Sequence, residues 1–306
     1  MPRDLEDQLI KYLTDAHAME VQALTQMRSA PGIAGDEQLA SAFRFHEGET
    51  ERHEALVRER LHAHDAAPSK LEDMLGAVSG KGFVLFARLN PDTPGKLAAH
   101  AYSYEHLELA VYELLARVAE RAGDAGSAEA ARSIRSDEDA MARRLSQLWD
   151  AALRDAGKLE SYLADAHALE AQSIALLQTA PRVAGQLAPL FEEHLVQTRE
   201  HMRLLEQRGK PNALKDAALR LGGLNWSGFF AAQRDTPAKL AAFAYAVEHL
   251  EIAGYELLRR VAERDGDAET VALADRILPE ERAAAEKLFA SFEPALNASL
   301  DAVLSA

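Results

Sequence analysis

Two carboxylates set among apolar residues are the first feature of this sequence that could carry chemistry. Leu97, Ala101, Glu105, Glu108 and Tyr112 follow one another at steps of three or four residues. On a helix this spacing places them on one stripe, the one that packs inward in a helix bundle. Burying an unpaired carboxylate is costly, and such groups are normally protonated, paired or bound to a metal. The side chains that meet Glu105 and Glu108 in the core therefore indicate what the protein does.

Every other long helical segment also carries ionisable groups on its apolar stripe. Glu20 lies one heptad from both Leu13 and Met27, and His46 lies one heptad before His53. The candidate metal ligands of the first half are Glu20, His46, Glu49, His53, Glu105, Glu108 and Glu138. Those of the second half are Glu170, His194, His201, Glu248, Glu251 and Glu281, with Gln197 at the position of Glu49.

A single buried histidine or glutamate usually indicates no more than a hydrogen-bonded core residue. Several carboxylates and two or three imidazoles that converge from four helices would repel one another and stay desolvated unless cations neutralise them. This donor set suits iron, manganese or zinc, and bundle cores with inward Glu and His hold dimetal centres. The alternative is a protonated or salt-bridged polar core. In the metal hypothesis Glu108 and Glu138 are shared ligands, Glu20 and Glu105 terminal ligands, and His46 and His53 imidazole ligands.

Composition limits the remaining classes of function. The 306 residues are rich in helix formers, contain 6% aromatic residues and carry a net charge of −15, which disfavours nucleic acids and anionic membranes as partners. The absence of cysteine excludes disulfides, thiolate catalysis and Cys-ligated metal sites. No apolar run reaches membrane-spanning length and the first residues lack a signal core, so a cytoplasmic protein is expected.

The sequence is a tandem duplication. Segment 96–121 returns as segment 239–264 with about twenty of twenty-six positions identical, and the halves align without a gap from Pro68 and Pro211 onward. We therefore predict two domains, 1–153 and 154–306, that form a fused pseudo-dimer. The chain is expected to be a monomer or to assemble further into a homo-oligomer.

Helical periodicity predicts an all-α fold with four main helices in each half. A longer connection between the second and third helices, with one or two short crossing helices in 69–88, is typical of a bundle with one crossover. The predicted helices of the first half are 5–28, 36–62, 95–123 and 127–153, and those of the second half are 158–178, 186–208, 237–264 and 268–291.

Four sequence segments resemble the YciE/YciF-type ferritin-like family. They are Ala18–Gln22, His46–Thr50, the run Glu105–Tyr112 with its copy Glu248–Tyr255, and the acidic pairs Asp137-Glu138 and Glu280-Glu281. The resemblance spans both halves and implies two tandem ferritin-like four-helix bundles, a dinuclear metal site in each and a stress-associated role. It also implies that two bundles which pair as separate chains in the family are fused here.

The candidate ligands depart from the pattern of ferritin-like oxidases, which carry Glu-x-x-His on the second and fourth helices. Here the second helix reads His46-x-x-Glu49, and the fourth reads Glu138-x-x-Met141 with no histidine. Gln197 replaces Glu49 in the second half, so that half should bind metal more weakly. Thr50 and its copy Thr198 could face the core instead of residues 49 and 197. Residues 49 and 197 would then lie outside the ligand set.

The leading functional hypothesis is a di-iron or di-manganese centre that handles oxygen or peroxide, as an oxidase-like or peroxidase-like enzyme, or that binds iron. Without cysteine the chain has no rubredoxin-like module, so a redox reaction would need an external electron donor. One alternative is a non-enzymatic, stress-associated helical scaffold with protonated or vestigial polar cores. A haem bundle with facing histidines is disfavoured. Tyr112 and Tyr255, His17 and His167, and His106 and His249 are left as either core residues or partners of the ligands.

Overall fold

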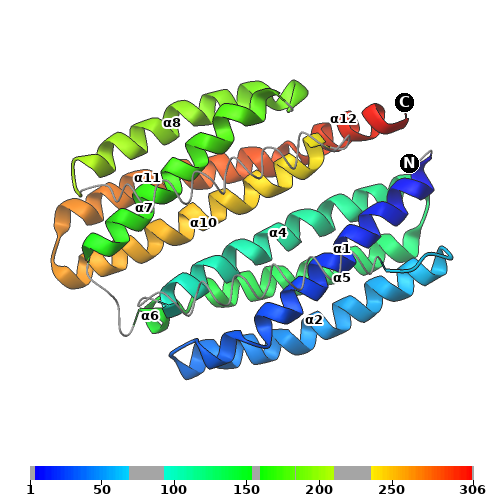
Figure 1. Cartoon of the computed structure of the whole chain (residues 1–306), viewed down its shortest axis with the longest axis horizontal. Helices are drawn as coiled ribbons and strands as arrows, with labels where there is room; N and C mark the ends of the chain where they lie inside the picture. The colour runs from blue at the N-terminus through cyan, green and yellow to red at the C-terminus, as the bar shows by residue number, and fades with distance from the viewer. Residues whose placement is uncertain (1–3, 69–92, 154–158, 183, 210–235, 305–306) are drawn as a thin grey trace. The chain divides into compact units, whose positions relative to one another are not determined.

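The structure is a computed structural model that describes residues 4–68, 93–153, 159–182, 184–209 and 236–304. The short crossing helices expected within 69–88 lie outside the described residues. All regular secondary structure in these ranges is helical, which confirms the predicted all-α class (Figure 1). No helix within these ranges is both long enough and apolar enough to cross a membrane.

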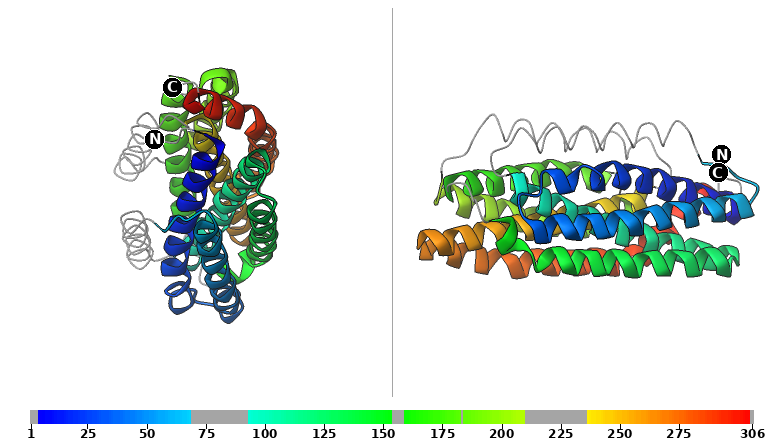
Figure 2. Two further views of the ribbon diagram at one scale, coloured as in Figure 1. Left: turned by 90° about the vertical axis from the view of Figure 1, so that its right-hand side faces the viewer. Right: turned by 90° about the horizontal axis from the view of Figure 1, so that it is seen from below.

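The chain separates into two compact units, Met1–Asp155 and Ala156–Ala306. The first unit is built from α1 (Leu5–Met27), α2 (Glu37–Ala63), α4 (Thr93–Ala122) and α5 (Ala125–Ser146), followed by the short α6 (Trp149–Ala152). Helix α1 packs on α2 and α4, and α5 packs on α4 and α2, so the four long helices enclose one core. Figure 2 shows these helices running side by side along their length.

The second unit repeats this arrangement with α7 (Leu159–Thr179), α8 (Ala188–Glu206), α10 (Thr236–Asp265) and α11 (Ala268–Ala290). Helix α7 packs on α8 and α10, and α11 packs on α10 and α8. A fifth helix, α12 (Phe292–Leu304), packs on α10 and was not predicted from the sequence. The predicted continuous helix 127–153 is also divided, because α5 ends at Ser146 and the chain re-enters a helix only at Trp149.

Short connections fix the register between the helices that carry most of the carboxylates. Gly123 ends α4 with a φ of 76°, a left-handed conformation that favours glycine, and the side chain of Asp124 then caps α5 by accepting from the backbone N–H groups of Gly126 and Ser127. Gly266 and Asp267 play the same parts between α10 and α11. These turns place Glu105 and Glu108 at the same height along the bundle as Glu138. In the second bundle they place Glu248 and Glu251 at the height of Glu281.

Candidate metal centres

Six ionisable side chains from all four helices meet in the core of the first bundle. Helix α1 contributes Glu20, α2 contributes His46 and His53, α4 contributes Glu105 and Glu108, and α5 contributes Glu138. None of the six is more than 3% exposed. Fully buried Leu13, Phe43 and Leu115 lie on the same helix faces, so the polar level is enclosed by apolar layers.

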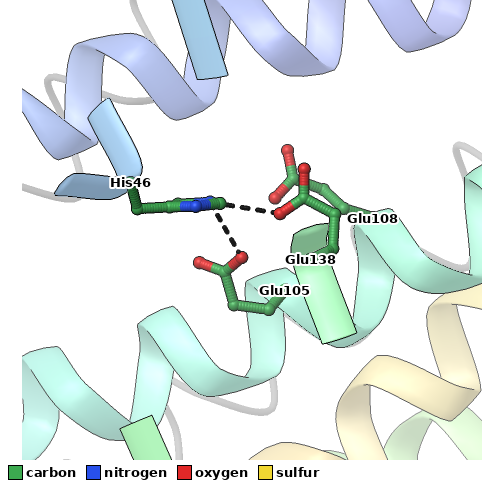
Figure 3. Close-up of side chains that lie close together, drawn as sticks. All are labelled: His46, Glu105, Glu108 and Glu138. Atoms are coloured by element: carbon green, nitrogen blue, oxygen red, sulfur yellow. Dashed lines mark ion pairs between the residues drawn. The ribbon is translucent and has the colours of Figure 1, made fainter. Parts of the chain in front are cut away.

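The first group of candidate ligands surrounds the Nε2 atom of His46 (Figure 3). This nitrogen lies 3.1 Å from Oε2 of Glu105 and 3.1 Å from Oε2 of Glu138. The carboxylate of Glu108 completes the group, in which one ligand atom from each residue lies within 4.8 Å of the others. Such a cluster of one imidazole and three carboxylates could hold a metal ion.

The second group of the same bundle consists of Glu20, His53 and Glu138. The Nδ1 atom of His53 lies 2.9 Å from Oε1 of Glu138 and 4.0 Å from Oε2 of Glu20. Glu138 therefore belongs to both groups and turns one carboxylate oxygen to each. A carboxylate in this position is suited to bridge two ions.

The second bundle builds the same pair of groups. The Nε2 atom of His194 lies 2.9 Å from Oε2 of Glu248 and 3.8 Å from Oε2 of Glu281. The Nδ1 atom of His201 lies 2.9 Å from the other oxygen of Glu281. Glu251 completes the first group and Glu170 completes the second, so Glu281 is the shared residue here.

Outer carboxylates determine which ring nitrogen of each histidine faces the centre. Oε2 of Glu49 lies 3.1 Å from Nδ1 of His46, and Oδ2 of Asp137 lies 3.1 Å from Nε2 of His53. Each carboxylate can accept from the outer N–H, so that the opposite nitrogen is the one that would lose its proton to bind a metal. Glu49, which the sequence placed among the candidate ligands, thus lies against the far side of His46 and outside both groups.

The inward place beside Glu49 is occupied by Thr50, whose hydroxyl donates to the carbonyl of His46 at 2.9 Å. In the second bundle Gln197 takes the position of Glu49, with its Oε1 atom 3.3 Å from Nδ1 of His194. Glu280 takes the position of Asp137, with its Oε2 atom 2.8 Å from Nε2 of His201. The sequence identified the acidic pairs of the fourth helices but gave no sign that their first members orient histidines.

Tyr112 and Tyr255 prove to be partners of the candidate ligands. The buried hydroxyl of Tyr112 donates to Oε1 of Glu20, and that of Tyr255 donates to Oε1 of Glu170. Each phenol fixes one carboxylate oxygen of its glutamate. The other oxygen, Oε2, has no hydrogen-bond partner in either residue. In Glu20 it is Oε2 that lies 4.0 Å from Nδ1 of His53, whereas in Glu170 it is Oε1 that lies 3.6 Å from Nδ1 of His201.

The remaining histidines that the sequence left open lie outside the groups. The Nδ1 atom of His106 donates to the carbonyl of Tyr102 at 2.7 Å, and His249 makes the matching bond to Tyr245. The Nε2 atom of His17 lies 2.8 Å from Oε1 of Glu54. His167 in turn lies 3.7 Å from a carboxylate oxygen of Glu206.

The atoms that face the two centres of the first bundle are buried without a hydrogen bond. They include both carboxylate oxygens of Glu105, Glu108 and Glu138, together with Nε2 of His46 and Nδ1 of His53. Native proteins satisfy nearly all of their buried polar atoms, so exceptions concentrated at one level of a core mark a group that could hold an ion. The donor types and their arrangement fit a divalent transition metal.

Comparison with known protein families gives one match that covers both halves of the chain. The sequence model described as "Domain of unknown function (DUF892)" matches residues 4–158 and again residues 157–301. The chain belongs to the DUF892 family. The prediction of a duplicated domain is thereby confirmed, and each bundle corresponds to one DUF892 domain. No solved structure matches the chain.

Burial controls protonation in the first DUF892 domain. Desolvation, reinforced by the charges of Glu138 and Glu20, raises the pKa of Glu108 far above its usual range. Desolvation also raises the pKa of Glu20 and the pKa of Glu105 to about 8 each, the latter against the lowering influence of His46. Without a cation these three carboxyl groups are therefore held in their neutral form at neutral pH.

The shared carboxylate and its imidazoles form the charged part of the same centre. Burial opposes ionisation of Glu138, but its contacts with His46 and His53 outweigh burial and lower its pKa to about 2. Burial likewise opposes protonation of His53, yet the contacts with Glu138 raise its pKa to about 9. In the second DUF892 domain burial prevails over a longer imidazole contact, and the pKa of Glu281 is raised.

Proposed function

We propose that each DUF892 domain of this chain binds a pair of transition-metal ions in its core. The observation that carries this proposal is the position of Glu138, which is buried, lacks any hydrogen bond and presents one oxygen to each of two histidine and carboxylate groups. Glu281 has the same position in the second bundle. A buried carboxylate between two imidazoles and three further carboxyl groups is well placed to bridge two cations.

In this proposal His46, Glu105, Glu108 and one oxygen of Glu138 hold one ion, while His53, Glu20 and the other oxygen hold the second. Glu49 and Asp137 keep the two imidazole rings in position through their outer nitrogens. When bound, a pair of iron or manganese ions would exchange electrons with a small oxidant such as oxygen or peroxide. The apolar layers around the ligands exclude bulk water, and an external donor would supply the electrons.

The arrangement supports a ferritin-like assignment of the YciE/YciF type, with oxygen or peroxide handling or iron binding in stress protection as its biological role. The donors are imidazole and carboxylate, which bind iron and manganese, and they come from four helices of a bundle. The fused pair of domains then carries two such centres in one chain.

A direct test is elemental analysis of the chain after purification without added metal or chelator. We expect about four transition-metal ions per chain, two for each bundle, mainly iron or manganese, with zinc as a substitute. Substoichiometric metal that a brief chelator wash removes would instead support the second hypothesis, a non-enzymatic helical scaffold whose polar cores are neutralised by protons. The raised pKa values of the buried carboxyl groups show how such a core could exist without metal.

Metal binding should release protons and should strengthen as the pH rises. The pKa values of Glu20 and Glu105 are raised to about 8 and that of His53 to about 9, so all three carry protons at neutral pH in the metal-free protein. Ligands must lose these protons to bind a cation, so affinity falls as the pH drops below about 8. Calorimetric titration with Mn²⁺ in buffers of different ionisation enthalpy should show the release of several protons per bundle.

The control for this titration is the double variant Glu138→Gln/Glu281→Gln, which lacks both shared carboxylates and should release none. Metal uptake with no proton exchange in the parent protein would show that the ligands are already ionised in the metal-free core. The raised pKa values of the carboxyl groups would then be contradicted.

The two bundles should also differ in how firmly they retain metal. Glu49 offers His46 a carboxylate acceptor, whereas Gln197 offers His194 only an amide at the slightly longer distance of 3.3 Å. A carboxylate acceptor makes the imidazole a better ligand, and loss of such an outer partner costs about 10- to 100-fold in metal affinity. We expect first-bundle metal to survive timed chelation longer, and Gln197→Glu to prolong retention in the second bundle.

The variants Glu138→Gln and Glu281→Gln each abolish metal binding in one bundle. They therefore show which bundle releases metal in each phase of the chelation time course. Glu49→Gln is the reciprocal control and should shorten retention in the first bundle. Equal loss from both bundles, unchanged by either exchange, would show that the residue behind the histidine has no influence on the metal.

A further inference from the structure

A small pocket reaches the candidate centre of the second bundle beside His194. It has room for a molecule about the size of one water. Leu177, Leu190, Phe191 and Leu288 contribute apolar walls, and a pocket with room for about one water is too small for a hydrated ion. Its polar lining includes His194, Gln197 and Glu248 of the candidate centre, and Ala284, Lys287 and Glu193 also line it.

The candidate ligands beside the pocket are more exposed than their counterparts in the first bundle. The side chains of His194 and Glu248 are 7% and 3% exposed, whereas those of His46 and Glu105 in the first bundle are 1% and 0% exposed. His201, at the other end of the second centre, is only 1% exposed. The additional exposure is therefore confined to the side of His194 where the pocket lies.

One residue on the fourth long helix is smaller in the second bundle than in the first. Ala284 lies one turn after the shared Glu281, and the equivalent residue of the first bundle is Met141, one turn after Glu138. Met141 is buried, and its flexible side chain adds three non-hydrogen atoms to the space that Ala284 leaves open. Methionine commonly fills such gaps in cores, which agrees with the lower exposure of His46 and Glu105 in the first bundle.

Contacts at the surface are present in both bundles and do not explain the difference. In the second bundle Lys287 forms an ion pair with Glu193 at 2.8 Å across α11 and α8. In the first bundle the equivalent residues Arg144 and Phe45 form a cation–π contact, with the guanidinium carbon 4.5 Å from the ring centroid. Each pair links the second and fourth helices. Leu177 and Leu190 of the lining replace Met27 and Ala42, which are no larger, so Ala284 is the buried lining position at which the second bundle has the clearly smaller side chain.

We propose that the pocket beside His194 admits a small uncharged molecule, such as water or a diatomic gas, to the second centre, and that the small side chain of Ala284 keeps this path open. The first centre, which has Met141 at this position, exchanges such molecules more slowly. This inference rests on the proposed metal function, since it concerns a ligand that approaches the bound ions. It assigns different roles to the two halves, an accessible centre in the second bundle and an enclosed one in the first.

The test uses nitric oxide, an uncharged diatomic probe, and the ferrous-loaded full-length chain without oxygen. Stopped-flow absorbance gives the rate of nitrosyl formation, and the Glu138→Gln and Glu281→Gln backgrounds assign each phase to one bundle. We expect the second bundle to bind nitric oxide at least about tenfold faster than the first. Ala284→Met should slow the second bundle to the rate of the first, and Met141→Ala should speed the first bundle by a similar factor.

The Met141→Ala variant keeps the test decisive if Ala284→Met does not fold, because removing side-chain atoms cannot create a clash. Equal rates in the two bundles, or rates that neither exchange alters, would overturn the inference while leaving metal binding intact. A chain that takes up no ferrous iron would fail at the loading step, and that result would refute the proposed function instead. Iron content measured before each mixing separates the two outcomes.

Discussion

Glu138→Gln is expected to remove both metal ions from the first bundle and to leave the second bundle loaded. The residue turns one oxygen to the group of His46 and the other to the group of His53, so a single amide weakens both positions at once. Loss of an outer partner already costs about 10- to 100-fold in metal affinity, and loss of a shared ligand should cost at least about 100-fold. Elemental analysis should show that metal per chain falls by half.

Asp139→Asn is the matched control for this variant. Asp139 is the next residue of α5, but it is 48% exposed and pairs with Arg143 on the surface, so its loss should leave the metal content unchanged. Glu281→Gln should remove the other half of the metal. If Glu138→Gln removed only one ion from its bundle, the two groups would not share this carboxylate.

Glu108→Met is expected to stabilise the metal-free protein while it abolishes metal binding at the group of His46. The carboxyl group of Glu108 is buried and has no hydrogen bond, and its raised pKa reflects the cost of charging it there. A buried polar group without a hydrogen bond costs about 1–3 kcal/mol, and an apolar side chain of similar size removes this cost. We expect a gain of this order in the free energy of unfolding of the metal-free chain, measured by urea denaturation.

With metal bound, the parent protein should be more stable than Glu108→Met. A ligand that binds only the folded state at about 100 times its dissociation constant stabilises it by about 2.7 kcal/mol, and the parent gains this at each occupied site while the variant loses it. Leu115→Met, an apolar exchange on the same stripe of α4, controls for the methionine itself. A metal-free Glu108→Met protein less stable than the parent would mean that Glu108 serves the fold rather than a metal.

The sequence was sufficient to predict the helical class, the duplication and the identity of the inward-facing charged residues. Heptad spacing places Glu20, His53 and Glu105 on apolar stripes, and the burial of these residues follows from that spacing. The division of the helix predicted at 127–153 was missed, since the residues around Gln147 carry no proline or glycine to mark the break. Helix α12 was missed although the buried Phe292, Leu296 and Leu300 recur every four residues, the spacing of a helix face.

The geometry within each centre depends on tertiary contacts that helical spacing does not encode. The helical spacing allowed either Glu49 or Thr50 to face the core. In the structure Thr50 is buried and Glu49 lies beside the outer nitrogen of His46. The partnership of Asp137 with His53 likewise requires the alignment of α2 with α5. The sharing of Glu138 between two groups follows from the same alignment and could not be read from one helix.

Anomalous diffraction at the absorption edge of the bound metal tests the central claim most directly. Crystals of the chain purified without chelator should show one peak on each side of the Glu138 carboxylate and one on each side of the Glu281 carboxylate. Each peak should lie about 2 Å from its imidazole and carboxylate ligands. Maps with no peak at either carboxylate, in crystals of chain that had been supplied with iron and manganese, would contradict it. The buried carboxyl groups would then be neutralised by protons alone.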